Sequence, residues 1–453
     1  MEKILEYIES NQERFLEELK TFLRFPSVSA QPAHKQDMIN CAQWLVGHLA
    51  GIGLETKLIE GDGHPIVRAR VKGTSARRLI IYGHYDVQPE DPLDQWLSPP
   101  FEPEIRNGKL YARGATDDKG QVFAHIKAIE AVLQTGQPLG GEVLFLIEGE
   151  EECGGTVLAD YIKYEKANLS KDALGVIVSD CEMLDENTPA ITYALRGMVA
   201  LEIGLKGPNR DLHSGTFGGA VGNPAIGLTS MISGCIQPNG EITIPGFYDD
   251  VSPLEDWEKE NFTKLPSEDE QLKTDLEVKS LLGPSEMTSL EKTWARPTFE
   301  VNGIFGGYQG QGSKTIIPSS AGAKITMRLV PNQDPAKIAQ VVKAHLQRIC
   351  PDFVEMTITD VFSTQPVLFD IKSPLIRSAC EALGEGFGQE TAYIRCGGSI
   401  PVVNTFSQEL EKPVLLMGFG LTSDGAHSPN ECFSVATFQR AIKASAALLG
   451  KIP

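Results

Sequence analysis

Long apolar runs are absent from this sequence: nowhere in its 453 residues do 18 apolar residues follow one another. A membrane-spanning helix needs about 20 such residues, so we expect no transmembrane segment and no membrane partner. The N-terminal segment also lacks the unbroken apolar stretch of a signal peptide. Its apolar residues recur instead at helical spacing among acids and lysines, at Ile4, Ile8, Phe15, Leu19 and Phe22. These features predict an amphipathic N-terminal helix and a cytoplasmic protein.

Positive charge and paired cysteines are also scarce. The 41 lysines and arginines are outnumbered by 60 acids, which leaves a net charge of −19. A chain this acidic repels phosphate backbones, so we expect no nucleic-acid partner. The eight cysteines are scattered and form no C-x-x-C pair, which indicates reduced and mostly buried thiols of a cytoplasmic protein.

The chain does contain enough apolar residues to build a core, because hydrophobic residues make up 41% of it. Domains commonly contain roughly 100–200 residues, so this length predicts two or three of them. The first part alternates short apolar runs with a helical pattern. Runs typical of buried parallel strands lie at 79–82, 143–147 and 174–178, and a helical pattern covers 121–133. This order predicts an α/β domain in which a doubly wound, mostly parallel sheet has helices on both faces.

The pattern changes near residue 195. Alternating strands and two helical segments then predict a smaller α+β domain of ferredoxin-like type, with strands at 199–205, 324–330 and 355–361 and helices at 224–232 and 335–349. A polar, acidic insertion occupies 246–296.

After about residue 370 the α/β pattern returns, with a helix at 374–383 and a buried strand at 414–417. We therefore divide the chain into a first part of the α/β domain at 1–196, an inserted α+β domain at 197–369 and a second part of the α/β domain at 370–453.

Histidines and acids concentrate in five short segments, at the ends of predicted strands or just before a helix. The segments are 83–87 (GHYDV), 114–120 (GATDDKG), 148–155 (EGEEECGG), 179–180 (SD) and 423–431 (SDGAHSPNE). Open α/β sheets place their functional sites at the carboxyl ends of their strands. The coincidence of five such segments is far more specific than any one of them.

Each segment alone also has a simpler explanation. His84 and Asp86 share a face of their strand, so the carboxylate is able to fix the imidazole, but a solvated histidine at a strand end fits equally. Asp117 and Asp118 precede a helix and are able to cap it. The four carboxylates within 148–152 repel one another in a dry site and require either cations or solvent.

Taken together, the two imidazoles and several carboxylates suit two divalent ions that share a bridging carboxylate, with one glutamate left to handle protons. The ligand types permit Zn²⁺, Mn²⁺ or Co²⁺.

The order of these segments resembles the dimetal aminopeptidase-like family, which contains carnosinases, cytosolic nonspecific dipeptidase, peptidase V, aminoacylase and succinyl-diaminopimelate desuccinylase. The carnosinase and nonspecific dipeptidase branch is the most similar, on the segments 211–215 (DLHSG), 313–318 (SKTIIP), 327–332 (MRLVPN) and 395–401 (RCGGSIP). The resemblance covers essentially the whole chain. It implies a metal-dependent hydrolase whose α/β domain is catalytic and whose inserted domain is a lid that mediates a homodimer.

The resemblance also implies roles in the catalytic domain. Two divalent ions, with Zn²⁺ as the first expectation, would bind at five ligands. His84 and Asp180 serve one ion, Glu152 and His427 serve the other, and Asp117 bridges both, beside a cis peptide to Asp118. Glu151 is left off the metals as the general base. Asp86 orients His84.

Four further residues belong to the lid and to segment 395–401. The resemblance implies that His213 enters the active site of the dimer partner and donates to the oxyanion of the tetrahedral intermediate. Arg328 offers a planar fork for a terminal carboxylate of the substrate, and Thr315 and Ser399 add hydrogen bonds to that carboxylate. Simpler interpretations also exist. Arg328 lies on an alternating strand, where an exposed arginine is common. Arg395, in segment 395–401, equally suits a structural ion pair.

Three functions are compatible with these residues. The first is a metallopeptidase that hydrolyses the peptide bond of dipeptides. The second is an amidase of N-acyl amino acids, of the aminoacylase or desuccinylase type, with the same metal core. The third is a metal-stabilised binding protein without activity, which predicts the loss of Glu151 or of a ligand, although all of these residues are present.

Overall fold

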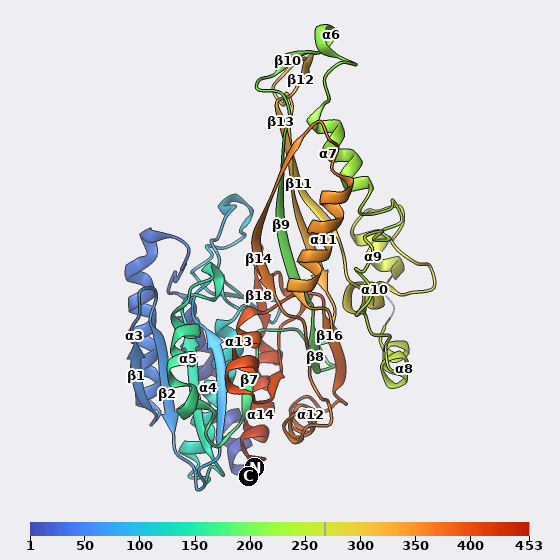
Figure 1. Ribbon diagram of the computed structural model, residues 1–453. Helices are drawn as coiled ribbons and strands as arrows, with labels where there is room; N and C mark the ends of the chain where they lie inside the picture. Colours follow the sequence, from blue (N-terminus) through green and yellow to red (C-terminus); the bar gives the residue numbers. More distant parts are fainter. Residues whose placement is uncertain (267–268, 453) are drawn as a thin grey trace. The chain divides into compact units, whose positions relative to one another are not determined.

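In the computed structural model, which describes residues 1–266 and 269–452, the chain divides into two compact units. The first comprises Met1–Tyr193, Phe369–Ile394 and the residues from Val402 onward, and the second comprises Ala194–Leu368 and Arg395–Pro401. Figure 1 shows the course of the chain.

The second unit includes residues 395–401, which the sequence analysis assigned to the second part of the α/β domain. Side-chain contacts explain the difference. Arg395 forms a buried ion pair with Glu258, and Ser399 accepts a hydrogen bond from Arg328 at 2.9 Å. Both partners belong to the second unit, so the short segment is anchored there.

The elements of the first unit alternate along the chain as the sequence predicts. Its helices are α1 (Glu2–Ser10), α2 (Gln12–Leu23), α3 (Lys35–Gly51), α4 (Lys119–Gln134), α5 (Val157–Ser170), α12 (Pro374–Phe387), α13 (Pro401–Leu410) and α14 (Val435–Leu449). Its strands are β1 (Glu55–Ile59), β2 (Ile66–Val71), β3 (Arg78–His84), β4 (Glu104–Arg106), β5 (Lys109–Tyr111), β6 (Glu142–Glu148), β7 (Ala173–Val178), β8 (Ala190–Leu195), β16 (Ala392–Cys396), β17 (Val414–Leu416) and β18 (Cys432–Ser434). β8, β16 and α13 each cross a boundary between the units.

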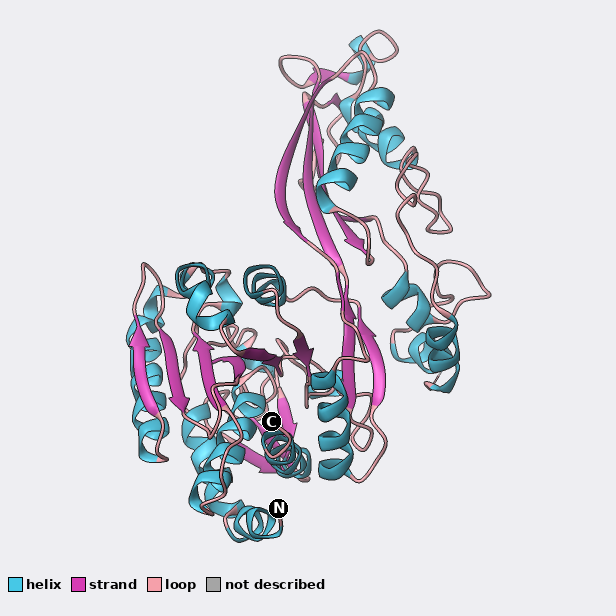
Figure 2. Cartoon of the chain, turned by 60° about the horizontal axis from the view of Figure 1, so that its bottom comes forward, coloured by secondary structure: helices cyan, strands magenta, loops and turns pink. Residues whose placement is uncertain are grey.

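The main sheet of the first unit has the strand order β1-β2-β6-β3-β7-β17-β8. The neighbours β6, β3, β7 and β17 run parallel, whereas β1, β2 and β8 join antiparallel at the two sides. Figure 2 shows helices on both sides of this sheet. The predicted doubly wound architecture is therefore confirmed, with the parallel strands at its centre.

The central strands are buried on both faces, which explains why they read as unbroken apolar runs. On β3, Leu79 and Ile81 join the core that contains residues of α4 and α14. Tyr82, which follows Ile81, faces the other side, where its ring meets Phe406 of α13 edge-on, with 5.7 Å between ring centroids. The sheet is thus held from both faces, and the ends of β3, β6 and β7 are fixed in register.

Helix α4 lies deep in the first unit and carries the loop that ends at Asp118. Its residues from Lys119 to Val132 are all buried, so it is covered on every side. Gly120 permits this close packing, because a Cβ atom there would lie 2.0 Å from the carbonyl oxygen of Ala115. The loop before α4 is therefore pressed against the helix start.

The N-terminal segment forms two helices, α1 and α2, rather than the single helix that the spacing predicts. The break falls at Asn11, whose side-chain amide donates to the carbonyl of Tyr7 at 2.8 Å. All five predicted apolar positions are buried: Ile4, Ile8, Phe15, Leu19 and Phe22. Among the described helices, none combines the length and the apolar character that crossing a bilayer requires.

The second unit is built around a four-stranded antiparallel sheet. The strands of this unit are β9 (Gly197–Lys206), β10 (Leu212–His213), β11 (Glu300–Gly306), β12 (Ile316–Ile317), β13 (Ser320–Leu329), β14 (Glu355–Thr364) and β15 (Val367–Leu368), of which β9, β11, β13 and β14 form the four-stranded sheet. Its helices are α6 (Ser214–Phe217), α7 (Pro224–Ser233), α8 (Asp256–Lys264), α9 (Asp269–Asp275), α10 (Ser289–Ala295) and α11 (Pro335–Ile349).

The main sheet of this unit has the order β11-β13-β9-β14, and β9, α7, β11, β13, α11 and β14 follow one another along the chain. This is the predicted ferredoxin-like arrangement. Leu201 and Ile203 of β9 share a core with Val342 and Leu346 of α11. The predicted insertion contains α8, α9 and α10, and the short pair β10–β12 lies with α6 beyond one end of β13 (Figure 1).

Candidate metal centre

The candidate site of the first unit lies where neighbouring parallel strands end. His84 is the last residue of β3. Glu151 and Glu152 open a short 3-10 turn just after β6, and Asp180 lies two residues after β7. Because β6, β3 and β7 are adjacent and parallel, their carboxyl ends meet at one edge of the sheet.

Two loops bring the remaining predicted ligands to the same place. Asp117 lies between β5 and α4, and the peptide bond from Asp117 to Asp118 is cis, as predicted. His427 follows a short 3-10 turn and adopts a positive φ of 62°. The five predicted ligands are thus drawn together from distant parts of the chain.

These ligands form two groups of three that share Asp117. In the first group, Nε2 of His84 lies 3.1 Å from Oδ1 of Asp117 and 4.0 Å from Oδ2 of Asp180. In the second, Nε2 of His427 lies 2.8 Å from Oδ2 of Asp117 and 3.3 Å from Oε1 of Glu152. Within each group the possible ligand atoms lie within 4.8 Å of one another. The two oxygens of Asp117 thus face different groups.

The electrostatics of the cluster require positive charge. Burial raises the pKa of Asp180 to about 7, and the neighbouring Asp117 adds to this shift. The carboxylates of Asp117 and Glu152 raise the pKa of His427 to about 10. Burial opposes ionisation of Asp117, but hydrogen bonds from His427 and His84 outweigh it and lower its pKa. Crowded carboxylates beside imidazoles form a donor set that fits divalent cations.

Glu151 differs from Glu152 although the two are adjacent. Glu152 belongs to the second ligand group, whereas Glu151 belongs to neither. Burial raises the pKa of Glu151 to about 9, and the charges of Asp180 and Glu152 contribute to the rise. The structure therefore leaves one half-buried carboxyl group, that of Glu151, beside the two ligand groups.

Surrounding polar groups hold the ligands in place. Nδ1 of His84 lies 3.0 Å from the backbone oxygen of Asp86 and 3.4 Å from its carboxylate, and that carboxylate accepts the backbone N–H of Glu152 at 3.0 Å. Asp86 thus connects two ligands. Asp118 makes no side-chain bond that caps α4; its carboxylate accepts the backbone N–H of His84 at 3.1 Å.

Three residues that the sequence did not indicate as site residues support the ligands. The buried carboxylate of Glu431 accepts the backbone N–H groups of Gly114, Thr116 and Asp117 and pairs with Arg113 at 2.9 Å. It therefore shapes the loop that presents Asp117. Glu431 lies within the fifth acidic segment, and Arg113 directly precedes the second. These positions were the sequence features that could have indicated a role at the site. Gln88 donates to the carboxylate of Glu152 at 2.8 Å, and no sequence pattern indicated it.

A further group with metal-ligand character, Glu18, His48 and Glu130, lies elsewhere in the first unit. The ammonium group of Lys127 occupies this group, at 2.5 Å from Glu18 and 2.7 Å from both His48 and Glu130. Its positive charge already forms ion pairs with the two carboxylates. The group is therefore a buried ion-pair network rather than a candidate metal site.

The predicted substrate residues lie in the second unit, in two separate places. His213 is exposed on β10, and the carbonyl of Thr315 accepts the backbone N–H of the next residue, Ser214, at 3.0 Å. Arg328, near the end of β13, donates to the hydroxyl of Ser399 at 2.9 Å. Arg395 pairs with Glu258, which supports its structural interpretation.

Comparison with known proteins identifies the class of protein. The model of the peptidase family M20/M25/M40 matches residues 80–451, which is more than half of the chain. A Cys-Gly metallodipeptidase of Schizosaccharomyces pombe is 33% identical over 98% of this chain and 96% of its own length. The human Beta-Ala-His dipeptidase is 30% identical over 95% of this chain and 88% of its own.

Solved structures also match this chain. The crystal structure of human carnosine dipeptidase 1 matches with a TM-score of 0.84 at 29% identity, covering 100% of this chain and 98% of that one. An M20 family metallo-carboxypeptidase from Sulfolobus solfataricus matches with a TM-score of 0.85 at 34% identity, covering 97% and 98%. The chain belongs to the M20/M25/M40 peptidase family. The predicted resemblance and the predicted metal-dependent peptide hydrolase are thereby confirmed.

Removal of the metal tests the candidate ligands. We expect chelation to abolish peptide hydrolysis and divalent ions to restore it, with about two ions per chain at saturation because the ligands form two groups. Cations displace protons from such groups, so metal uptake should release protons. Affinity should rise as the pH increases through about 7, where Asp180 loses its proton. Titration calorimetry measures the metal affinity and its pH dependence, and elemental analysis measures the number of bound ions. Full activity in a verified metal-free sample would contradict the assignment of the ligands.

Proposed function

We propose that this chain is a dipeptidase that hydrolyses dipeptides with a free carboxyl end at a two-metal centre. The observation that carries the proposal is the pair of ligand groups sharing Asp117, with the half-buried carboxyl of Glu151 beside them. His84 and Asp180 complete one group, and Glu152 and His427 complete the other. Zn²⁺ suits this mixture of imidazole and carboxylate, and Mn²⁺ and Co²⁺ are the alternatives that metal addition tests.

Glu151 handles the protons of the reaction. Divalent ions bound at the two groups would supply Lewis-acid chemistry, acidifying water and polarising a peptide carbonyl. Glu151 takes a proton from the attacking water at its carboxylate and delivers it to the nitrogen of the leaving amine. Nearby cations lower a raised carboxyl pKa toward the neutral range, where one group is able both to accept and to return a proton. Asp86 orients the ring of His84.

Arg328 anchors the substrate carboxylate. Its guanidinium is fixed by Ser399, whose hydroxyl in turn donates to the backbone carbonyl of Arg196 at 2.5 Å. The hydroxyl of Ser399 therefore already has a donor and an acceptor within the second unit. Its primary role is to hold Arg328, and a planar guanidinium held in this way suits bidentate binding of a carboxylate.

One dipeptide is too short to reach both groups of substrate residues in a single second unit. Thr315 precedes β12 and lies before the start of β13, whereas Arg328 lies near the end of β13. The eight residue-to-residue steps from Ser320 to Arg328 span about 27 Å in an extended strand. An extended dipeptide spans only about 7 Å. His213 and Thr315 therefore serve the site of a second copy of the chain.

A homodimer formed through the second unit supplies that second copy. The edge strands of its sheet are β11 and β14, and edge strands offer unpaired backbone groups. Large apolar side chains are exposed on both: Ile304 and Phe305 on β11, and Val361 and Phe362 on β14. A two-fold dimer makes the exchange reciprocal, so each His213 donates to the oxyanion in its partner's site. All eight cysteines are thiols outside any disulfide, which supports a cytoplasmic location.

The reaction itself distinguishes a dipeptidase from an amidase. Relatives with similar lengths are dipeptidases by name, which favours a free amino end over an N-acyl group. We expect kcat/KM for Ala-Ala to exceed that for N-acetylalanine by at least about tenfold, because the two substrates share the anchored carboxylate and differ at the amino end. The opposite preference, measured on the same metal-loaded sample, would support the amidase function.

Adjacent glutamates allow a matched test of the general base. We expect Glu151→Gln to keep both metal ions but to lower kcat by about 10²- to 10⁴-fold, because the proton-transfer group is lost. Glu152→Gln is the matched control and should weaken metal binding instead. Steady-state kinetics with elemental analysis separate the two effects. Near-normal kcat in Glu151→Gln would assign the base elsewhere.

Mixing two inactive variants tests the shared site. In a mixed dimer of Glu151→Ala and His213→Ala, one site keeps Glu151 and receives an intact His213 from the partner. Random exchange makes about half of the dimers mixed, each with one good site, so activity should recover to roughly a quarter of wild type. If His213 serves its own chain, every site stays defective, and no activity returns after exchange verified by labelled subunits.

A further inference from the structure

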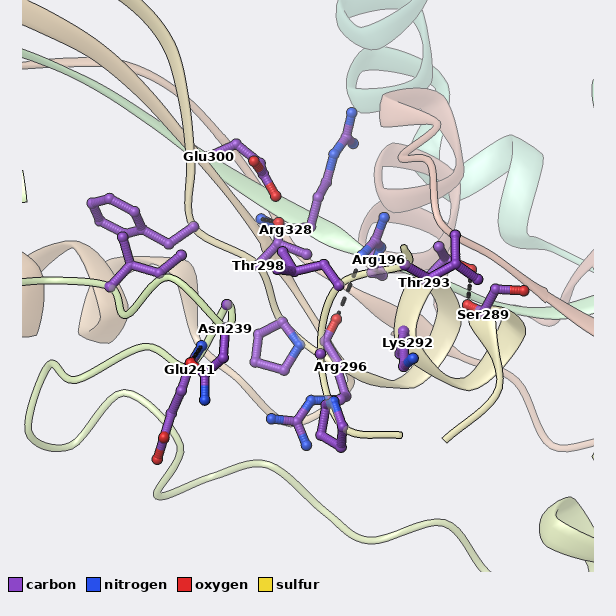
Figure 3. A pocket seen from close by; sticks show the side chains of 18 of the residues that line it. Arg196, Asn239, Glu241, Ser289, Lys292, Thr293, Arg296, Thr298, Glu300 and Arg328 are labelled. Carbon is purple, nitrogen blue, oxygen red and sulfur yellow. Dashed lines mark hydrogen bonds between the residues drawn. The ribbon is translucent and has the colours of Figure 1, made fainter. Parts of the chain in front are cut away.

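The second unit contains a large cavity beside the substrate anchor. Its volume is about 1140 Å³, and its walls include both Arg196 and Arg328, together with Lys292 and Arg296 near α10 and Glu300 at the start of β11. Figure 3 shows these side chains around the cavity. The proposed function uses only Arg328, and Arg196 was not singled out from the sequence. The cavity also exceeds what one terminal carboxylate needs.

Arg196 and Arg328 are held in place through backbone and hydroxyl groups. Nε of Arg196 donates to the carbonyl of Gly397 at 2.8 Å, and a terminal nitrogen donates to the carbonyl of Arg296 at 3.4 Å. The Arg196 guanidinium approaches Gly397 so closely that a Cβ atom there would lie 2.8 Å from it. Ser399 connects Arg328 to the backbone of Arg196. Both side chains are therefore ordered without an acidic partner.

Arg196 and Arg328 both have a lowered pKa and, among the described residues, no carboxylate in an ion pair with them. Burial, together with the positive charge of Arg328, lowers the pKa of Arg196 to about 10. Burial also lowers the pKa of Arg328. Within the described part of the chain, neither guanidinium forms an ion pair, and Glu300 is exposed to solvent.

Arg196 and Arg328 are half-buried, whereas the two buried arginines of the described chain have carboxylate partners. Arg113 pairs with Glu431 at 2.9 Å, and Arg395 pairs with Glu258. Two neighbouring cations that lack such a partner are costly to desolvate. That cost is recovered when an anion binds between them, and two guanidiniums have room for two carboxylate groups.

We propose that the cavity beside Arg328 binds the side-chain carboxylate of an acidic C-terminal residue of the substrate. Arg328 takes the terminal carboxylate, and Arg196 takes the side-chain carboxylate of a C-terminal glutamate or aspartate. Lys292 and Arg296 add positive potential along the cavity wall without a direct contact. This inference rests on the proposed dipeptidase function and assigns it a preferred substrate class, the dipeptides that end in an acidic residue.

An isosteric substrate pair tests the proposal. Ala-Glu and Ala-Gln differ by one charge and hardly in shape, so folding and metal content cancel in their ratio. We expect wild-type kcat/KM to favour Ala-Glu by at least about tenfold, as for a buried charge pair. Arg196→Met should bring this ratio close to one, and Arg196→Lys should retain part of it. Lys292→Met is the matched control, because it removes the same charge from the same cavity.

The outcomes separate the two proposals. If dipeptides are hydrolysed but wild type does not favour Ala-Glu, the cavity does not bind the side-chain carboxylate and the dipeptidase function stands. If no dipeptide is hydrolysed by the metal-loaded enzyme, the proposed function itself is wrong. A preference that survives in Arg196→Met, or that Lys292→Met removes equally, overturns the role of Arg196.

Inhibition of the wild-type enzyme gives a measurement that does not depend on a variant's folding. Glutarate carries two carboxylates, and its monoamide carries one with nearly the same shape. Glutarate should inhibit Ala-Ala hydrolysis competitively and at least about tenfold more strongly than the monoamide, because only glutarate engages both arginines. Equal inhibition by the two compounds contradicts the proposal.

Discussion

Repulsion among crowded carboxylates is the constraint on which the candidate metal centre depends. Asp117, Glu152 and Asp180 converge with Glu151 at the ends of buried parallel strands, where solvent screens their charges poorly. Burial raises the pKa of Asp180 to about 7 and that of Glu151 to about 9. Such a cluster is stable only when it holds protons or cations. The same requirement that makes the site costly for the fold makes its donor set suited to divalent cations.

The rest of the first unit holds this cluster in place. The parallel strands fix the ends of β3, β6 and β7 in register, and the fully buried α4 supports the loop that carries Asp117. Glu431 binds three backbone N–H groups of that loop and pairs with Arg113. Metal-ligand side chains in loops gain their precision from such supporting contacts.

The two units contribute different chemistry. The first carries the acids and imidazoles, whereas the predicted substrate residues of the second are cationic or neutral. Arg328 and Arg196 form a positive pair near one end of β13, and the exposed His213 lies beyond its other end. The length of that strand separates the two functions within one chain. The proposed sharing of a site between two copies of the chain rests on this distance, and the proposed substrate preference rests on the missing acidic partner of the two arginines.

The sequence by itself determined the elements and the chemistry close to them. Apolar runs such as 79–82 and 143–147 predicted the central strands because strands buried on both faces need apolar side chains throughout. The acids that follow them indicated metal ligands because parallel strands end at one edge. Local sequence pattern predicted neither the helix break at Asn11 nor the supporting role of Gln88, because each depends on contacts within the fold. Only the tertiary structure decided that segment 395–401 joins the second unit and that Arg196 lies beside Arg328, because no periodicity records which distant side chains meet.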